Sequence, residues 1–288
     1  MQGDKYSAVW VSYSSISDFL RCPRLYFLKN VYRSPGTGHK IKLMSPPLAL
    51  GLTVHDVLES ISVLPTSERF RESLVSRFDL FWTRVSGKLG GFLDEDIEQR
   101  YKRRGERICE QLMGKPGVLS EQAVKIKKDL PYYWLSEKEG IILCGRIDWL
   151  SYIKESDSVH IIDFKTSSRD EDPKSLQLPI YFLLASSCQQ RKVTKASYWY
   201  LERENGLIEQ PLPHISKSYD QVMEVAQKIK LARQLRLFKC LHKTGCSFCS
   251  PYDAVLQGSA EFVGINRYGE DVFVLEKSKE ELKESVLL

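Results

Sequence analysis

The segment between Cys144 and Tyr181 places the strongest constraint on the fold of this chain. It contains two apolar runs, CGRIDWLSYI and SVHIIDFK, separated by the polar stretch Lys154-Glu155-Ser156-Asp157. Apolar runs on either side of a polar turn predict an antiparallel hairpin. We expect strands at about 141–153 and 158–165, followed by a helix at 174–187.

The hairpin would bring two acids together. If it is symmetric about Glu155-Ser156, Asp148 lies directly across from Asp163. Cross-strand neighbours have Cβ atoms about 4.5–5.5 Å apart, so one divalent cation could be shared between the carboxylates. Side chains alternate along a strand, so Lys165 points the same way as Asp163. A register shift of two residues would keep both acids on one face.

These residue types suit metal-assisted cleavage of a phosphodiester. Adjacent carboxylates repel each other unless a cation or a proton compensates, and Mg²⁺ or Mn²⁺ can do so while retaining water. Lys165 could offset charge on the phosphate, and Gln177 and Tyr181 share one face of the following helix. His55, on an earlier helix, could complete the metal shell. The alternatives are a solvated strand face and a packing histidine, but the ordered set favours catalysis.

Composition sets wider limits. The 288 residues, with 42% hydrophobic and 27% charged content, are ordinary for a soluble globular protein. A net charge of +5 is a mild indication of an anionic partner. We expect no membrane span, because no run of about 18 apolar residues occurs. We expect no secretory signal, because the start lacks the basic-then-apolar layout of one, and seven irregularly spaced cysteines favour a reducing cytoplasm.

Other local patterns predict the elements around the hairpin. Ser15-Ile16-Ser17-Asp18 fits a capping box, and Pro23 after Cys22 predicts a helix kink. Helical spacing predicts further helices at 46–61, 67–85, 95–112 and 219–238, and alternation predicts strands at 121–127, 196–202 and 206–212.

In this order the motifs resemble the RecB-like branch of the PD-(D/E)XK nuclease superfamily, which includes CRISPR-associated RecB-like exonucleases and AddB-type nuclease domains. The matching segments are SYSSISDFLRCPRLYFL, GLTVHDVLE, GRIDWL, DFKTS and QLPIY. The resemblance implies a single α/β domain over residues 1–288. Its restriction-endonuclease-like core would have a central mixed β-sheet flanked by helices, with a helical insertion at about 65–115.

The resemblance also implies residue roles. Metal ligands would be His55, Asp148, Asp163 and the backbone carbonyl of Phe164. Catalytic residues would be Asp148, Asp163, Lys165, Gln177 and Tyr181. Glu121 stands where relatives often carry an additional acid, although a solvent-facing strand glutamate is an equally good interpretation.

Four cysteines form a separate group. Relatives often hold an iron–sulfur cluster with one N-terminal and three C-terminal cysteines, which implies a [4Fe–4S] site at Cys22, Cys240, Cys246 and Cys249. The spacing here is Cys-x5-Cys-x2-Cys, whereas the usual order is Cys-x2-Cys-x5-Cys. Zinc or unliganded thiols remain alternatives. The other three cysteines, Cys109, Cys144 and Cys188, are expected to be buried apolar residues.

Basic clusters, including Lys125, Lys127 and Lys128, are most simply solvated faces, but around a cleft they would supply phosphate contacts to nucleic acid. We therefore expect a Mg²⁺- or Mn²⁺-dependent deoxyribonuclease in the cytoplasm, an exonuclease on single strands or DNA ends. Recombination-repair or CRISPR-adaptation proteins would be its partners, and no oligomeric state is predicted. The alternative is a non-catalytic DNA- or protein-binding module that retains the fold and a structural cysteine-bound metal.

Overall fold

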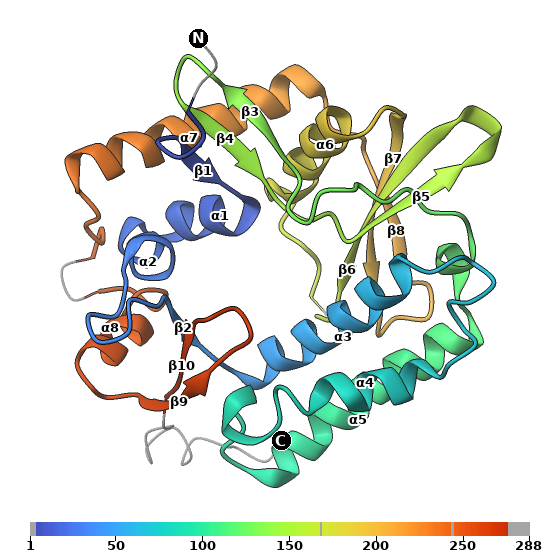
Figure 1. The fold of residues 1–288 in the computed structure, drawn as a ribbon, viewed down its shortest axis with the longest axis horizontal. Coiled ribbons are helices and arrows are strands. Elements are labelled where there is room, and N and C mark those ends of the chain that lie inside the picture. Colours follow the sequence, from blue (N-terminus) through green and yellow to red (C-terminus); the bar gives the residue numbers. More distant parts are fainter. Residues whose placement is uncertain (1–3, 168, 243–244, 276–288) are drawn as a thin grey trace.

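A four-stranded mixed sheet contains the predicted hairpin. The computed structural model describes residues 4–275, apart from 168 and 243–244. The strands are β5 (Trp149–Ile153), β6 (Ser158–Lys165), β7 (Lys192–Tyr200) and β8 (Leu207–Gln210), in the order β5-β6-β7-β8. Strand β6 is antiparallel to β5 and parallel to β7, and β8 is antiparallel to β7. The chain therefore has the expected mixed α/β, restriction-endonuclease-like core (Figure 1).

The register of the hairpin agrees with the sequence argument. Trp149 pairs with Ile162, and Ile153 pairs with Ser158. One further step along both strands sets Asp148 opposite Asp163. The symmetric turn predicted about Glu155-Ser156 is thus confirmed, with the short 3₁₀ segment Lys154–Ser156 inside it.

Helices cover both faces of this sheet (Figure 1). On one face, α6 (Gln177–Cys188) and α7 (Ile215–Leu235) share a core with Ile161. On the other, α3 (Pro46–Ser62), α4 (Leu74–Trp82) and α5 (Glu95–Gly114) share a core with Ile162 and Phe164. Alternation along β6 explains the division, because successive residues face opposite sides.

Two small sheets bring distant segments together. Strand β1 (Val9–Val11) runs parallel to β4 (Ile141–Cys144), which also pairs with β3 (Tyr132–Ser136). Strand β10 (Asp271–Val274) pairs with both β2 (Ile41–Leu43) and β9 (Glu261–Ile265). The remaining elements are α1 (Tyr13–Arg21), α2 (Pro23–Tyr26), α8 (Ser250–Leu256), a π-helical segment (Phe27–Val31) and 3₁₀ turns at Gly87–Gly90 and Gly117–Ser120.

Two strand predictions were wrong. The expected strand at 141–153 breaks between Cys144 and Trp149, and its halves β4 and β5 join different sheets. The break frees Asp148 from strand pairing. The expected strand at 121–127 is reduced to one isolated bridge between Ala123 and Ser151, because its residues follow the edge of β5 for only a short distance.

Two helix boundaries also differ. The capping box consists of Ser12 and Ser15, not Ser15 and Asp18. Asp18 is instead buried, where it accepts a hydrogen bond from Lys29 at 2.7 Å. The helix predicted at 67–85 is helical only over Leu74–Trp82, since Ser73 caps its start. The kink predicted at Cys22-Pro23 is confirmed, because Cys22 is extended between α1 and α2.

Within the described residues, none of the helices has the length and apolar character needed to cross a membrane.

Candidate active site

The two acids lie at one end of the β5–β6 hairpin. Asp163, in β6, is 1% exposed, and the side chain of Asp148, just before β5, is 14% exposed. The backbone N–H of Phe164 donates to Oδ2 of Asp148 at 3.0 Å, which fixes this carboxylate beside β6. Both carboxylates therefore belong to one buried group.

This acid pair is electrostatically unfavourable without a cation. Burial, and then the charge of Asp148, raise the pKa of Asp163 to about 7. Oδ2 of Asp163 accepts no hydrogen bond within the described structure, although Nζ of Lys165 lies 2.9 Å away without hydrogen-bond geometry. A buried carboxylate oxygen that accepts no hydrogen bond is suited to bind a hard cation such as Mg²⁺, which prefers oxygen ligands.

His55 faces the pair from α3. Its Nδ1 lies 3.4 Å from Oδ1 of Asp148. Burial opposes protonation, but the charge of Asp148 raises the pKa of His55 to about 9. The same contact holds the pKa of Asp148 below its ordinary value, even though burial acts in the opposite direction. A neutral imidazole could bind a metal, so ion binding here would release a proton.

Lys165 lies on the other side of Asp163. Its ammonium is 3.0 Å from Oε2 of Glu171 and 2.5 Å from Oε1 of Gln177. Burial would lower the pKa of Lys165, but the charges of Asp163 and Glu171 raise it well above its ordinary value. The side chain is therefore a fixed cation beside the acid pair.

Gln177 and Tyr181 are brought into the same group by the first turns of α6. Nε2 of Gln177 donates to Oδ1 of Asp163 at 2.5 Å and lies 3.4 Å from the hydroxyl of Tyr181. Burial, followed by the nearby acids, raises the pKa of Tyr181, so it stays a neutral hydroxyl. Gln177 thus bridges Asp163 and Lys165.

Two further members of the group, Glu171 and Tyr13, were not predicted from the sequence. Glu171 contacts Lys165, and the hydroxyl of Tyr13, at the start of α1, donates to Oε1 of Glu171 at 3.0 Å. The backbone N–H of Glu171 donates to the hydroxyl of Tyr200 at 2.8 Å. Glu171 stands in the polar run SSRDEDPK, where an acid is unremarkable. Tyr13 lies inside the motif SYSSISDFLRCPRLYFL, and that position is the one sequence signal that could have marked it.

The structure places Glu121 elsewhere. Its side chain accepts a hydrogen bond from Ser151 at 3.2 Å. Ser151 pairs with His160, three residues before Asp163 on the opposite face of the sheet. Three residues of strand span about 10 Å, so Glu121 is not brought together with Asp148 and Asp163.

A cavity of about 480 Å³ opens beside the acid pair. His55, Asp148 and Phe164 form part of its wall. Further out, the wall includes four basic residues, Lys125, Lys127, Lys128 and Arg146. This volume suits a small ligand or one nucleotide.

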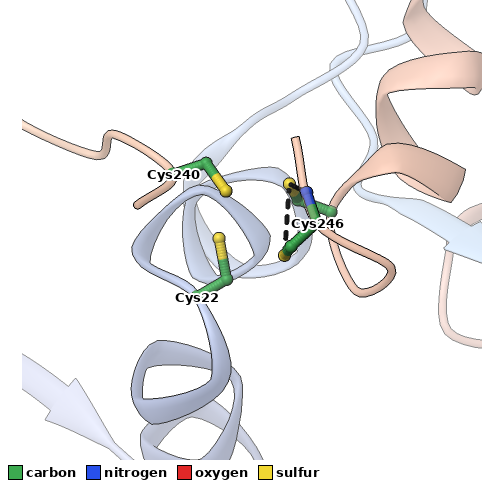
Figure 2. Close-up of side chains that lie close together, drawn as sticks. Cys22, Cys240 and Cys246 are labelled. Atoms are coloured by element: carbon green, nitrogen blue, oxygen red, sulfur yellow. Dashed lines mark hydrogen bonds between the residues drawn. The ribbon is translucent and has the colours of Figure 1, made fainter. Parts of the chain in front are cut away.

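The four grouped cysteines form a second candidate site (Figure 2). The sulfur atoms of Cys22, Cys240, Cys246 and Cys249 all lie within 4.8 Å of one another. Cys22 separates α1 from α2, and Cys249 immediately precedes α8. Although burial acts against it, the N–H groups of Cys249 and Phe248 lower the pKa of Cys246 to about 7, which favours the thiolate that binds metal. Four sulfurs from two chain segments fit a [4Fe–4S] cluster or zinc.

The other cysteines are not part of this group. Cys109 and Cys144 are buried, as expected, and burial raises the pKa of each thiol. Cys188, at the end of α6, is only partly buried, so that expectation was too strong.

The chain matches a model of a known protein family. The family model of the PD-(D/E)XK nuclease superfamily matches residues 10–254. This range includes both the acid pair and the four grouped cysteines. No curated protein matches the chain.

Proposed function

Since the chain belongs to the PD-(D/E)XK nuclease superfamily, we propose that its acid pair is the active site of a metal-dependent deoxyribonuclease. One observation carries this proposal. Asp148 and Asp163 lie opposite each other in the hairpin, and Asp163 keeps a buried oxygen without a hydrogen bond beside the cationic Lys165.

The proposed ligands of Mg²⁺ or Mn²⁺ are Asp148, Asp163, His55 and the carbonyl of Phe164. A bound ion supplies a water of lowered pKa and offsets charge on the phosphate. Hydrolysis would join a water oxygen to phosphorus and break the bond from phosphorus to the leaving oxygen, which gives a phosphomonoester on one fragment and a hydroxyl on the other.

The side chains around the acids have distinct parts in the proposal. Gln177 orients Asp163 through the 2.5 Å hydrogen bond, and Tyr181 supports Gln177 from the next turn of α6. Lys165, held as a cation, offsets the charge that develops on the phosphate in the transition state.

The finer assignment is an exonuclease of the RecB-like branch that acts on single strands or DNA ends. Its support is the depth of the acids below the surface and the adjoining cavity. A single domain over residues 1–288 and a role with recombination-repair or CRISPR-adaptation proteins follow from the same resemblance and remain predictions. A cytoplasmic location follows from the cysteine usage and also remains a prediction.

For the grouped cysteines we propose a [4Fe–4S] cluster, with zinc as the alternative. The support is the approach of four sulfurs to within 4.8 Å. Anaerobically purified protein should be brown, with about four iron and four sulfide per chain, and Cys246→Ser should lose both. A colourless protein with one zinc per chain would replace the cluster by the alternative.

A non-catalytic binding module is the second candidate, and one observation favours it. Each acid already has a cationic neighbour, because His55 lies 3.4 Å from Asp148 and Lys165 lies 2.9 Å from Asp163. The group could therefore persist as a structural network without any ion.

The test is an assay with end-labelled single-stranded and duplex DNA, in Mg²⁺, Mn²⁺ or chelator. The wild type should degrade DNA only with metal. Asp163→Asn should lose at least about a thousandfold in rate and still bind DNA. Asp157→Asn, in the exposed hairpin turn, is the matched control and should remain active. Metal-independent cleavage, or equal rates for Asp163→Asn and wild type, would refute the nuclease proposal.

A further inference from the structure

We propose that the cavity beside Asp148 is the inner end of a groove that binds single-stranded DNA, a proposal that rests on the proposed function. A second cavity, of about 660 Å³, adjoins the first. The two cavities share the wall residues Ser62, Val63, Ala123, Val124 and Lys125. The groove therefore runs outward between the end of α3 and the segment 122–129.

The depth of the acids decides which form of DNA fits. Asp163 is 1% exposed, and Asp148 faces the inner cavity. A duplex holds its phosphates on the outside of a wide, stiff cylinder, which cannot enter a cavity of about 480 Å³. A single strand can bend and insert one nucleotide, so that its phosphate reaches the carboxylates.

The charge along the groove suits a phosphate backbone. Lys125, Lys127 and Lys128 are exposed, and in the described part of the chain none of the three forms an ion pair with an acid. Nζ of Lys125 donates instead to Oγ of Ser62 on α3 at 2.8 Å, so it reaches across the groove. The inner cavity is also lined by Asp56, Glu59 and Asp129. Asp56 pairs with Arg267 and Glu59 pairs with Arg146, so the three lysines of segment 122–129 are the cations proposed to contact successive phosphates.

An aromatic residue at the edge of the inner cavity provides a surface for a base. Tyr268, in the turn between β9 and β10, is 55% exposed and lines this cavity. Its neighbour Arg267 contacts Asp56 of α3, which fixes the turn beside the groove. Stacking on an aromatic ring is independent of sequence and adds to backbone binding.

The test measures binding of fluorescein-labelled oligothymidine in chelator, where no metal-dependent cleavage interferes. The triple variant Lys125→Glu/Lys127→Glu/Lys128→Glu should bind at least about tenfold more weakly, with a salt slope reduced by about two. The control variant Lys5→Glu/Lys138→Glu/Lys217→Glu makes the same charge change on exposed lysines elsewhere and should bind nearly as tightly as wild type. Tyr268→Ala should weaken binding roughly fivefold, and Tyr268→Phe should not.

Two results would overturn the groove. One is equal loss in the two triple variants, which indicates a general charge effect. The other is a duplex of the same length that binds as tightly as the single strand. Because binding is measured without metal, either result leaves the cleavage assay to decide the nuclease proposal separately.

A different observation concerns Lys165, and from it we infer that Glu171 is a positioning residue for this lysine. Three oxygen atoms surround the ammonium, from Asp163 at 2.9 Å, Glu171 at 3.0 Å and Gln177 at 2.5 Å. Asp163 and Gln177 belong to the acid group itself, whereas Glu171 stands in the loop after β6. Glu171 is therefore the partner outside the acid group that holds the ammonium of Lys165 in its position.

Glu171 is itself held from two sides. The hydroxyl of Tyr13 donates to its carboxylate at 3.0 Å, and its backbone N–H donates to the hydroxyl of Tyr200 at 2.8 Å. A carboxylate fixed by α1 and β7 can keep the lysine in place while a phosphate approaches. Small misplacements of a catalytic group cost up to about a hundredfold in rate.

The variants Glu171→Ala, Glu171→Gln and Asp172→Ala separate positioning from structure. Glu171→Ala should cleave roughly tenfold more slowly at saturating DNA, with KM within about twofold of wild type. Glu171→Gln should recover most of that loss, because its amide oxygen can still accept from Lys165 or Tyr13. Asp172→Ala, the exposed neighbour, should be unaffected.

A readout besides cleavage is the modification of Lys165 by an amine-selective reagent, measured by mass spectrometry. Glu171→Ala should increase it several-fold, and Glu171→Gln should increase it less. Unchanged modification of Lys165 in Glu171→Ala would contradict the inference, as would a Glu171→Gln variant that cleaves as slowly as Glu171→Ala.

Discussion

The acid pair and the grouped cysteines are built in opposite ways. Asp148, Asp163, Lys165 and Gln177 come from one continuous stretch of chain, and the hairpin register brings them together. The cysteines come from both ends of the fold, Cys22 beside α1 and the others beside α8. Local sequence therefore brings the two acids together, whereas the four cysteines meet only when distant segments pack against each other. We expect the first to control chemistry and the second to control stability.

Helix α1 connects the two regions. Tyr13, at its start, contacts Glu171 beside Lys165, and Cys22 follows its end. Damage to the cysteine group could reach the acid pair through this helix. The following predictions test how separate the two regions are.

The largest effect is expected at Lys165. Lys165→Met should lower the cleavage rate by at least about a hundredfold, with little change in DNA affinity in chelator. Lys174→Met replaces an exposed lysine of the following loop and should cleave normally. Rates and DNA affinities from single-turnover assays test this. If Lys165→Met loses less than threefold in rate, the lysine has no part in the chemistry.

The next effect is expected at the cysteines. Cys246→Ser should lower the free energy of unfolding by about 3 kcal/mol, because a metal that binds only where the distant segments meet adds its binding free energy to folding. The fraction that remains folded at 25 °C should cleave within about threefold of wild type. Thermal unfolding and rate measurements, with Cys188→Ser outside the group as control, test the prediction. A Cys246→Ser variant that is as stable as wild type but no longer cleaves DNA would contradict the proposal that the cysteines control stability and the acid pair controls chemistry.

A smaller effect is expected for the ion pair between α2 and α8. Arg24 donates to Oδ1 of Asp253 through Nε at 2.9 Å and through a terminal nitrogen at 2.6 Å. Both side chains are partly exposed, so Arg24→Met should cost only about 0.5–1 kcal/mol. In a Cys246→Ser background the cost should differ, since the two contacts close the same segments. If the two substitutions, Arg24→Met and Cys246→Ser, lower the free energy of unfolding in urea by strictly additive amounts, the ion pair and the cysteine group act independently.

The smallest effect is expected at Asp271, at the start of β10. Its carboxylate accepts from Thr37 at 2.5 Å and lies 2.8 Å from Nδ1 of His39. Burial opposes ionisation, but these contacts hold the pKa of Asp271 below its ordinary value. The ionised form therefore stabilises the fold above about pH 4, and this stabilisation is lost as pH falls through the lowered folded-state pKa.

At pH 7, Asp271→Asn should be less stable than wild type by about 1 kcal/mol, and the gap should narrow below pH 4. Urea unfolding at pH 3, 5 and 7 tests this, with the exposed Asp220→Asn as control. If the difference in free energy of unfolding between wild type and Asp271→Asn grows as the pH falls, the prediction is wrong.

Much of the central fold could be predicted from the sequence. The strand at 158–165, the hairpin register and the helices at 46–61 and 95–112 follow from alternation, turn polarity and helical spacing, and the structure agrees. These signals are local, so a single sequence is enough to read them.

The peripheral sheets could not be predicted in this way. Val9–Val11 and Ile41–Leu43 are three residues each and are stabilised by partners far along the chain, at Ile141 and Asp271. The break between β4 and β5 also depends on distant partners, because β4 pairs with strands of one sheet and β5 with strands of another. Glu171 likewise joins the acid group through a tertiary contact that no sequence pattern records.

The most direct test of the shared cation is the binding of Mn²⁺ to chelator-treated protein, measured by electron paramagnetic resonance. Wild type should bind Mn²⁺ at a site that Asp148→Asn and Asp163→Asn each abolish and that Asp157→Asn retains. If either active-site variant binds Mn²⁺ as wild type does, or if wild type binds none, the two carboxylates do not hold a common ion.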